Sequence, residues 1–479
     1  MPKSFPLLLL SAVVFSQISA QTRSLTLKEA IALAQEQSVA ARLAENVREN
    51  RAFAYQTFLA GLKPQLSFQA GLPTYSRDFF EVRQDDGSVR YLSRTQNIAQ
   101  AGFSLFQVIP LTGGTVSVNT DFTRFDDFDK KYSSYNGTPV NIEWRQPLFA
   151  FNPYKWSRKI EPLKMQEAQK TYKFQMEDIA QRTVLLFFSV LDAQEEVRIA
   201  TLNLENNRQI KAIEERRIEL GTTTREKLLQ IELQVLRATQ SLQEANADLR
   251  NARLNFQAFL GIQDNQSIGA QIPEEGAALR IDPDQALQQA RENRSEYIAF
   301  ERQRLESTRD VEEARLSRNQ ATLRASLGFN GAGENVGDIF NPLTDQERLS
   351  VGITVPVLDW GRSKARQGIA AANEKVTAYN IEQEEINLRT EIVNQVNTLE
   401  LLRESIRFAR QTTAIAEERY QLALEQYQIG KLTVTDLNIA LSEKDASSRT
   451  YLSALRRYWE AYYRLRQMTL YDYELGQKL

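Results

Sequence analysis

The chain has neither cysteine nor histidine among its 479 residues. Without cysteine it has no disulfide, no thiol nucleophile and no thiolate metal ligand, and without histidine it has no imidazole base and lacks the commonest transition-metal ligand. The sequence also shows no cluster of acid, base and nucleophile at a workable spacing. We therefore expect no cofactor and no metal site, and the chain is not predicted to be an enzyme.

An excess of either charge is also missing. Lysine and arginine total 59 against 61 for aspartate and glutamate, so the chain carries no basic footprint for nucleic acid. Long apolar runs are rare as well, because stretches such as Val184 to Leu191 fall far short of the roughly 20 residues that a spanning helix needs. If the chain crosses a membrane, it must do so with strands.

The first 20 residues have the layout of a cleaved secretory signal. Lys3 precedes an apolar run from Phe5 to Phe15, and Ile18-Ser19-Ala20 stands before Gln21. The run is too short for a membrane anchor, and no cysteine follows it, which excludes an acylated lipoprotein start. We predict that residues 1–20 are removed and that the mature chain leaves the cytoplasm.

Two long stretches, 154–220 and 362–429, contain very little glycine or proline and are predicted to be helical rods of about 65 residues. At 1.5 Å per residue, each rod would run about 100 Å. Single helices are also expected over 27–60 and 282–318. No globular domain needs rods of this length, so an elongated architecture is predicted.

Residues 225–259 carry a heptad pattern that predicts a coiled coil rather than an ordinary amphipathic helix. Its seam consists of Leu228, Ile231, Val235, Ala238, Leu242, Ala245, Leu249, Ala252, Phe256 and Phe259. A second apolar line consists of Leu229, Leu233, Leu236 and Leu254. The helix is therefore expected to contact two neighbours. The seam returns after Gly430, where Lys444 and Ser447 interrupt it and predict a less well packed or partly wet middle.

Four segments alternate between apolar and polar residues and are predicted to be core strands: 65–72, 140–145, 323–329 and 349–355. An insertion, 73–138, carries two further alternating runs, 98–106 and 115–122, without a counterpart in the second half of the chain. These runs would either extend a barrel beyond the membrane or form a surface flap, and the sequence does not choose between them.

The chain is predicted to be an internal repeat. Residues 21–280 and 281–479 each contain a helix, a strand pair, a long helix, a tip turn and a returning helix, followed by an equatorial segment, which in the first half is an irregular belt over 261–281. Pro147 and Gly221 of the first half have counterparts in Pro356 and Gly430 at the same separation. Four strands from one chain cannot close a barrel, and an open edge in lipid leaves backbone groups unpaired, so copies of the chain must supply the rest. Two copies would give about eight strands and three about twelve.

The signal, the duplicated halves and the glycine-centred tips resemble the TolC-like outer-membrane efflux protein family over about residues 25–470. The resemblance implies an α+β membrane protein: a homotrimer with a 12-stranded transmembrane β-barrel, four strands per protomer, continued by a long periplasmic α-helical coiled-coil barrel. It implies a passive, gated exit duct in the cell outer membrane, serving a tripartite efflux or type I secretion system. The expected partners are outer-membrane lipid, a periplasmic adaptor and, through the adaptor, an inner-membrane transporter.

By this resemblance the two tips would dock the adaptor and close the duct. The docking residues would be Gly221, Thr222, Thr223, Thr224, Gly430, Lys431, Leu432 and Thr433. The periplasmic gate would consist of Asp436, Tyr427, Lys227 and Glu226. A purely structural interpretation stays open, because glycine favours the left-handed end of a helix and threonine caps the next one.

Two positions depart from the family pattern at the gate. Asp436 matches an acidic position that forms a cation-binding ring, and Tyr427 matches one that locks the closed state. However, Lys227 replaces an aspartate, and Ile439 replaces a second acidic residue. The gate is therefore closed either by a cation ring or by a Lys227 to Asp436 pair.

The alternative to an exit duct is a secreted periplasmic coiled-coil scaffold or tether without a pore.

Overall fold

The computed structural model describes residues 23–262, 268–276, 280–318 and 320–479, so the predicted signal, 1–20, lies outside the described residues. These residues form two compact units. We call residues 23–45, 173–293 and 391–479 the tip unit, and residues 46–172 and 294–390 the sheet unit. Each unit draws on both predicted halves of the sequence, so the boundary at 280 stays a prediction about sequence organisation.

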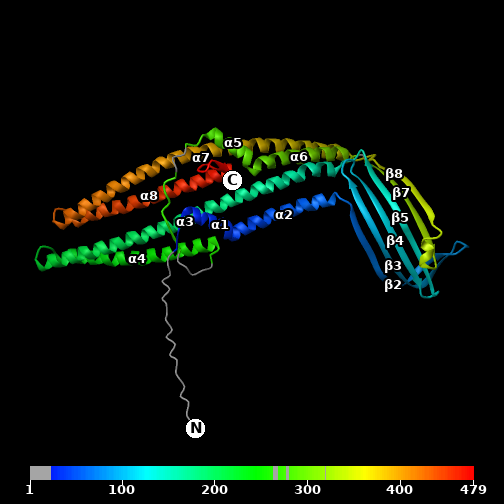
Figure 1. Ribbon diagram of the computed structural model, residues 1–479, viewed down its shortest axis with the longest axis horizontal. Helices are drawn as coiled ribbons and strands as arrows, with labels where there is room; N and C mark the ends of the chain where they lie inside the picture. Colours follow the sequence, from blue (N-terminus) through cyan, green and yellow to red (C-terminus); the bar gives the residue numbers. More distant parts are fainter. Residues whose placement is uncertain (1–22, 263–267, 277–279, 319) are drawn as a thin grey trace, which may run out of the picture. The chain divides into compact units, whose positions relative to one another are not determined.

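The sheet unit contains one antiparallel sheet of six strands in the order β2-β3-β4-β5-β7-β8 (Figure 1). The strands are β2 Gln65–Arg83, β3 Val89–Ile109, β4 Gly114–Asp127, β5 Tyr132–Leu148, β7 Gln320–Gly333 and β8 Thr344–Thr354. The sheet thus has six strands, two more than the four core strands predicted, while the predicted twelve-stranded barrel stays a prediction. The alternating runs of the 73–138 insertion form β3 and β4, because their backbones pair in register with the strands on either side.

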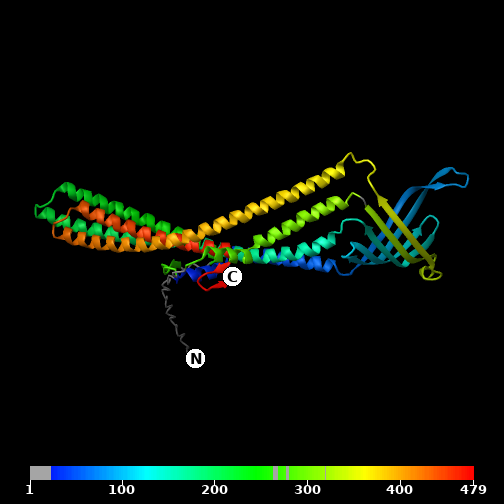
Figure 2. The ribbon, with the colours of Figure 1, turned by 90° about the horizontal axis from the view of Figure 1, so that it is seen from above.

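The long helices agree with their prediction. Helix α3 covers Pro153–Glu219 and helix α7 covers Arg362–Gln428, each of 67 residues. Each is followed by a returning helix of 36 residues, α4 Arg225–Leu260 and α8 Val434–Thr469. Figures 1 and 2 show how each returning helix follows its long helix back from the tip.

The two shorter rods are each broken into two helices, so the predicted single helices are wrong. The first consists of α1 Leu27–Gln37 and α2 Val39–Gly61, and the second of α5 Pro283–Asn293 and α6 Ser295–Leu316. Ser38 has an extended backbone (ψ 152°), and its hydroxyl accepts a hydrogen bond from the Ala41 N–H at 3.0 Å. This contact caps the next helix, as serine does at many helix starts.

The predicted seam of α4 is buried or half-buried throughout, and five of its members are fully buried: Leu228, Ile231, Ala245, Leu249 and Phe256. The second apolar line behaves differently. Leu229, Leu233, Leu236 and Leu254 are between 47% and 67% exposed. One chain therefore satisfies the first predicted contact of the helix and leaves the second line without a partner.

The middle of α8 is dry, which corrects the expectation of a poorly packed or wet segment. Lys444, Asp445 and Ser447 are all buried. The Lys444 ammonium lies 4.3 Å from the centre of the Tyr420 ring, and Asp445 accepts a hydrogen bond from Asn203 at 2.8 Å. Aromatic and amide partners thus make burial of these polar side chains tolerable.

Within the tip unit, short strands tie down the predicted belt. Strand β1, Arg23–Leu25, pairs in parallel with β6, Ile268–Ala270, and β9, Tyr471–Asp472, pairs with β10, Gln477–Lys478. Strand β1 thus ties the first described residues to the belt, while β9 and β10 form a separate pair near the C-terminus. Among the helices that the structure describes, none is long and apolar enough to cross a membrane.

Candidate functional site: the helical tips

Each long helix ends at a glycine with a left-handed backbone. Gly221 has a φ of 68°, and its N–H donates to the Ile218 carbonyl at 2.9 Å, while the Thr222 N–H donates to the Arg217 carbonyl at 2.8 Å. These two bonds form a Schellman motif, which satisfies carbonyls at the helix end. The space where a side chain would stand at Gly221 is open.

The second tip has the same geometry. Gly430 has a φ of 77°, and its N–H donates to the Tyr427 backbone carbonyl at 3.0 Å. The Lys431 N–H donates to the Gln426 carbonyl at 2.9 Å. The position is equally open. Glycine is therefore required at both tips by backbone conformation and not by a neighbouring atom.

Threonines cap both returning helices. The Thr224 hydroxyl accepts a long hydrogen bond from the Lys227 N–H at 3.5 Å. The Thr433 hydroxyl accepts one from the Asp436 N–H at 3.3 Å, while the Asp436 carboxylate accepts from the Thr433 hydroxyl at 2.6 Å and its N–H at 3.3 Å. Thr433 and Asp436 thus form a reciprocal capping box, so the turn-and-cap role is real at both tips and docking would be a further role.

The remaining predicted tip residues are largely exposed. Lys227, Glu226 and Asp436 all face solvent in the single chain. Among the described residues, Asp436 bonds to Thr433 of its own helix start and forms no ion pair with Lys227. A pair with Lys227, or a ring of carboxylates, would have to form between copies of the chain, and both stay predictions.

Tyr427 is the predicted gate residue that is buried among specific polar partners. Its side chain is only 1% exposed, and its hydroxyl donates to a Glu214 carboxylate oxygen at 3.1 Å. Arg217 donates to the same oxygen at 2.7 Å, and its guanidinium lies 5.4 Å from the centre of the Tyr427 ring. These three side chains connect α7 to α3.

Electrostatics fix the direction of the Tyr427 hydrogen bond. Burial, reinforced by the nearby Glu214 carboxylate, raises the pKa of Tyr427 to about 12. Burial acts to raise the pKa of Glu214, but hydrogen bonding by Thr223, and then by Arg217 and Tyr427, outweighs burial and lowers that pKa. At neutral pH the phenol therefore keeps its proton and donates to an ionised carboxylate.

An apolar cluster surrounds this contact and brings four helices together. It consists of Ile210 from α3, Ile231 from α4, Tyr420, Ala423 and Tyr427 from α7, and Leu437 and Ala440 from α8. Because the cluster joins both tips of one chain, Tyr427 holds the two helix pairs together from within.

Sequence reasoning identified Tyr427 but missed Glu214 and Arg217. The two residues are one turn apart on α3, a spacing at which side chains share a helix face. That spacing was visible in the sequence, but charged pairs at this separation are common along every helix of the chain. Only the packing of α7 against α3 distinguishes this pair.

A second polar cluster lies in the tip unit, away from the turns. Arg466 of α8 donates to Glu177 of α3 at 2.7 Å and also pairs with Asp472 of β9. Its two acidic partners are about 5% exposed, and burial raises the pKa of Glu177 despite the arginine. The Tyr462 hydroxyl donates to Asp472 at 3.1 Å. One guanidinium therefore compensates two buried carboxylates.

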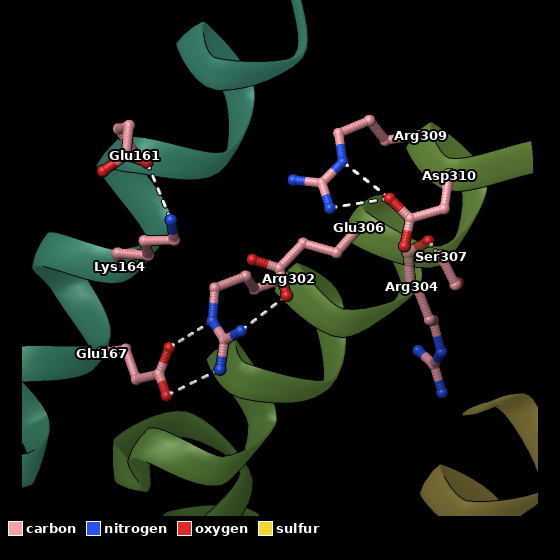
Figure 3. A network of polar contacts seen from close by, with 9 residues as sticks. All are labelled: Glu161, Lys164, Glu167, Arg302, Arg304, Glu306, Ser307, Arg309 and Asp310. Atoms are coloured by element: carbon pink, nitrogen blue, oxygen red, sulfur yellow. Dashed lines mark hydrogen bonds and ion pairs between the residues drawn. The ribbon is translucent and has the colours of Figure 1, made fainter. Parts of the chain in front are cut away.

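In the sheet unit, Arg302 of α6 forms the corresponding connection to α3 (Figure 3). Its guanidinium donates to both oxygens of Glu167, at 2.6 and 3.1 Å, and to Glu306 at 2.7 Å. This fork-to-fork geometry fixes the relative orientation of two helices better than a single ion pair does. In Figure 3, Arg304 points away from this network, and it pairs with Glu385 of α7 at 3.1 Å. These contacts fix the position of α6 relative to α3 and α7.

The model of the outer membrane efflux protein family matches residues 60–262 and 286–469. The chain belongs to the outer membrane efflux protein family. The predicted resemblance is thereby confirmed, and the match covers both long helices, both returning helices and the whole sheet. No curated protein sequence matches the chain.

Solved structures agree with this outer membrane efflux protein in fold. The CmeC outer membrane channel of Campylobacter jejuni is 16% identical, with a TM-score of 0.67 over 92% of this chain and 85% of that one. VceC of Vibrio cholerae is 14% identical, with a TM-score of 0.65 over 92% and 95%. The open state of the Neisseria gonorrhoeae MtrE channel is 15% identical, with a TM-score of 0.61 over 92% and 88%. The α+β fold is that of outer-membrane channels.

Proposed function

We propose that three copies of this outer membrane efflux protein form a passive, gated exit duct through the outer membrane, coupled by a periplasmic adaptor to an inner-membrane transporter. The observation that carries the proposal is the open sheet. Strand β2 pairs only with β3, and β8 only with β7, among the described strands. Two unpaired edges in lipid are unstable, and copies of the chain around an axis remove them.

The exposed apolar line of α4 supports the same assembly. Leu229, Leu233, Leu236 and Leu254 have no cover in one chain, and a closed ring of helices would bury them against the next copy. Burial of a leucine side chain stabilises such an assembly by about 1.5–3 kcal/mol. The helices and the sheet therefore require the same completion by sister chains.

Exposed aromatic side chains mark the boundary between strands and helices. Phe149 lies between β5 and α3 and is 86% exposed, and Trp360 lies between β8 and α7 and is 89% exposed. Both have a positive φ, at 57° and 50°, which is uncommon for bulky residues. Aromatic rings at this level of a membrane barrel suit the interface between lipid and water.

Conductance in planar lipid bilayers tests the proposal against the alternative of a secreted scaffold or tether. The purified full chain should insert and give discrete channel openings, with larger conductance once the tip is loosened. A scaffold gives no conductance with any tip variant. Absence of the protein from outer-membrane fractions would also remove the proposal.

We expect Asp436→Ala to increase leak through the closed duct. The substitution removes the carboxylate half of the capping box while the Thr433 hydroxyl stays, so it costs helix α8 less than the roughly 1 kcal/mol of a lost cap, and it removes one carboxylate per copy from the proposed gate. Leak is read as bilayer conductance and as antibiotic sensitivity of cells that express the variant.

Asp436→Asn separates the two effects of that substitution, because it keeps a capping side chain and loses the charge. If charge closes the gate, the asparagine variant leaks as the alanine variant does. If only the cap matters, it behaves as the wild type. Unchanged conductance and cation sensitivity in both variants would exclude a gating role for Asp436.

We expect Gly430→Val to abolish cross-linking to the adaptor while trimers persist. A β-branched residue at a φ of 77° is strained, by about 1–2 kcal/mol, and the turn must change shape even though no atom blocks the side chain. Gly368→Ala is the matched control, since Gly368 lies within α7 and has equal space around it. Loss of the trimer in Gly430→Val would mean that the turn serves assembly instead of docking.

A further inference from the structure

We propose that β3 and β4 are membrane-spanning strands of the barrel, so that each chain contributes six strands. The assembly then encloses a wider pore than four strands per chain would give. The proposal rests on the proposed function, because it concerns the barrel of the same duct. The alternatives for these two strands, an extension beyond the membrane or a surface flap, follow from the sequence. Register and side-chain alternation distinguish membrane-spanning strands from both alternatives.

The apolar face of the sheet continues through β3 and β4 without a gap. A single row of directly paired residues crosses five strands, from Leu66 to Leu105, Val118, Ile142 and Leu327. Phe68 and Phe103 extend the apolar face beside this row, with ring centres 4.9 Å apart. A flap outside the membrane is not expected to continue the apolar face of the strands that flank it.

One row along, the apolar face reaches the last strand. Val116 of β4 pairs with Trp144 of β5, Trp144 with Ala325 of β7, and Ala325 with Leu349 of β8. Leu349 is 74% exposed and Trp144 is 40% exposed in the single chain. Further along β4, the 3-10 helix η1, Val336–Ile339, and Phe340 pack on the same face at Phe122. Lipid chains are the occupant that the exposed stretch of Trp144 and Leu349 fits, by its chemistry and its place in an outer-membrane channel.

The opposite face is polar across the same strands. The row next to the apolar one runs from Ser67 to Ser104, Asn119, Asn141, Gly328 and Gln346. The Ser104 hydroxyl donates to the Asn119 side chain at 2.6 Å, which is a hydrogen bond between β3 and β4 themselves. Apolar outside and polar inside is the alternation of a membrane barrel with an aqueous lumen.

The two strands are also long enough to span the membrane. Strand β3 has 21 residues and β4 has 14, and a tilted membrane strand needs about 9–11. Strand β4 pairs with β3 from Gly114 to Asp127 and with β5 from Thr115 to Asp127. Both neighbours are thus paired along the stretch that would cross the membrane.

Six strands from each of three copies would close a barrel of about eighteen strands, against about twelve for four strands per chain. Because barrel diameter grows roughly in proportion to strand number, the barrel would be about 1.5 times as wide. Barrels of this size hold an open aqueous channel.

Single cysteines test the placement of β3, because the chain has no cysteine of its own. Ser104→Cys should react with a membrane-impermeant maleimide from the lumen, whereas Leu105→Cys should react only with a lipid-soluble one. The matched controls are Ser326→Cys and Leu327→Cys on β7, a strand that lies in the barrel under either arrangement. Each variant is accepted only if it forms the wild-type oligomer in detergent.

The outcomes separate this inference from the proposed function. Alternating cysteine labelling on both β3 and β7 supports six membrane-spanning strands per chain. Alternation on β7, with both β3 cysteines open to the aqueous reagent, overturns the inference and leaves the duct intact. Failure of alternation on β7 overturns the duct itself. Electron microscopy of the wild-type oligomer provides a test without variants: about eighteen strands support the inference, and about twelve contradict it.

Discussion

Arg466→Met should lower the free energy of unfolding by about 3–5 kcal/mol, because it removes the single cation that compensates two buried carboxylates. Glu177 and Asp472 are 5% and 6% exposed in the wild type, so both charges depend on the guanidinium for compensation. Methionine keeps most of the length and apolar contact of the arginine stem. The loss therefore reports charge and not packing. The measurement is the thermal unfolding midpoint of the oligomer in detergent.

Arg464→Met is the matched control on the same helix. Arg464 pairs with Glu391 at 2.7 Å, but the two side chains are 42% and 47% exposed. Exposed pairs contribute about 0–1 kcal/mol, so this variant should unfold close to the wild type. Equal midpoints for the two variants would contradict the assignment of Arg466 as the compensating cation.

Tyr427→Ala should open the tip and raise single-channel conductance several-fold. The substitution removes a ring that is 1% exposed and the hydrogen bond to Glu214. Truncation of a buried aromatic residue costs about 3–5 kcal/mol, and here that loss falls on the cluster that holds the two helix pairs together. Conductance in planar bilayers and uptake of a large antibiotic by cells are the measurements.

Tyr427→Phe divides this effect into its two parts. It keeps the ring and removes only the hydroxyl, and the Glu214 carboxylate keeps its hydrogen bond from Arg217 at 2.7 Å. The expected loss is about 1 kcal/mol, with a conductance between that of the wild type and that of Tyr427→Ala. Wild-type conductance in both variants would exclude Tyr427 from the gate.

The rods could be predicted because their signals are local. Scarcity of glycine and proline placed α3 and α7, and the heptad seam placed α4, whose members Leu228 and Phe256 are buried. Gly221 and Gly430 likewise adopt the left-handed conformation that their position after a long helix indicates. These features depend on residues close together in the sequence.

The strand count could not be predicted because it depends on long-range pairing. The 98–106 and 115–122 runs had the correct alternation, yet only the register of Leu105 with Leu66 and Val118 shows that they continue the same face. The break at Ser38 was missed for a similar reason. Its cap to Ala41 lies in a fully buried setting that a single serine in a helical pattern does not reveal.

The mass of the native particle extracted from outer membranes in mild detergent tests the central claim most directly, since an open sheet in lipid must be completed by sister chains. Native mass spectrometry should find three copies of the mature chain and no stable monomer. A monodisperse monomer, or a particle that stays in solution without detergent, would contradict the account.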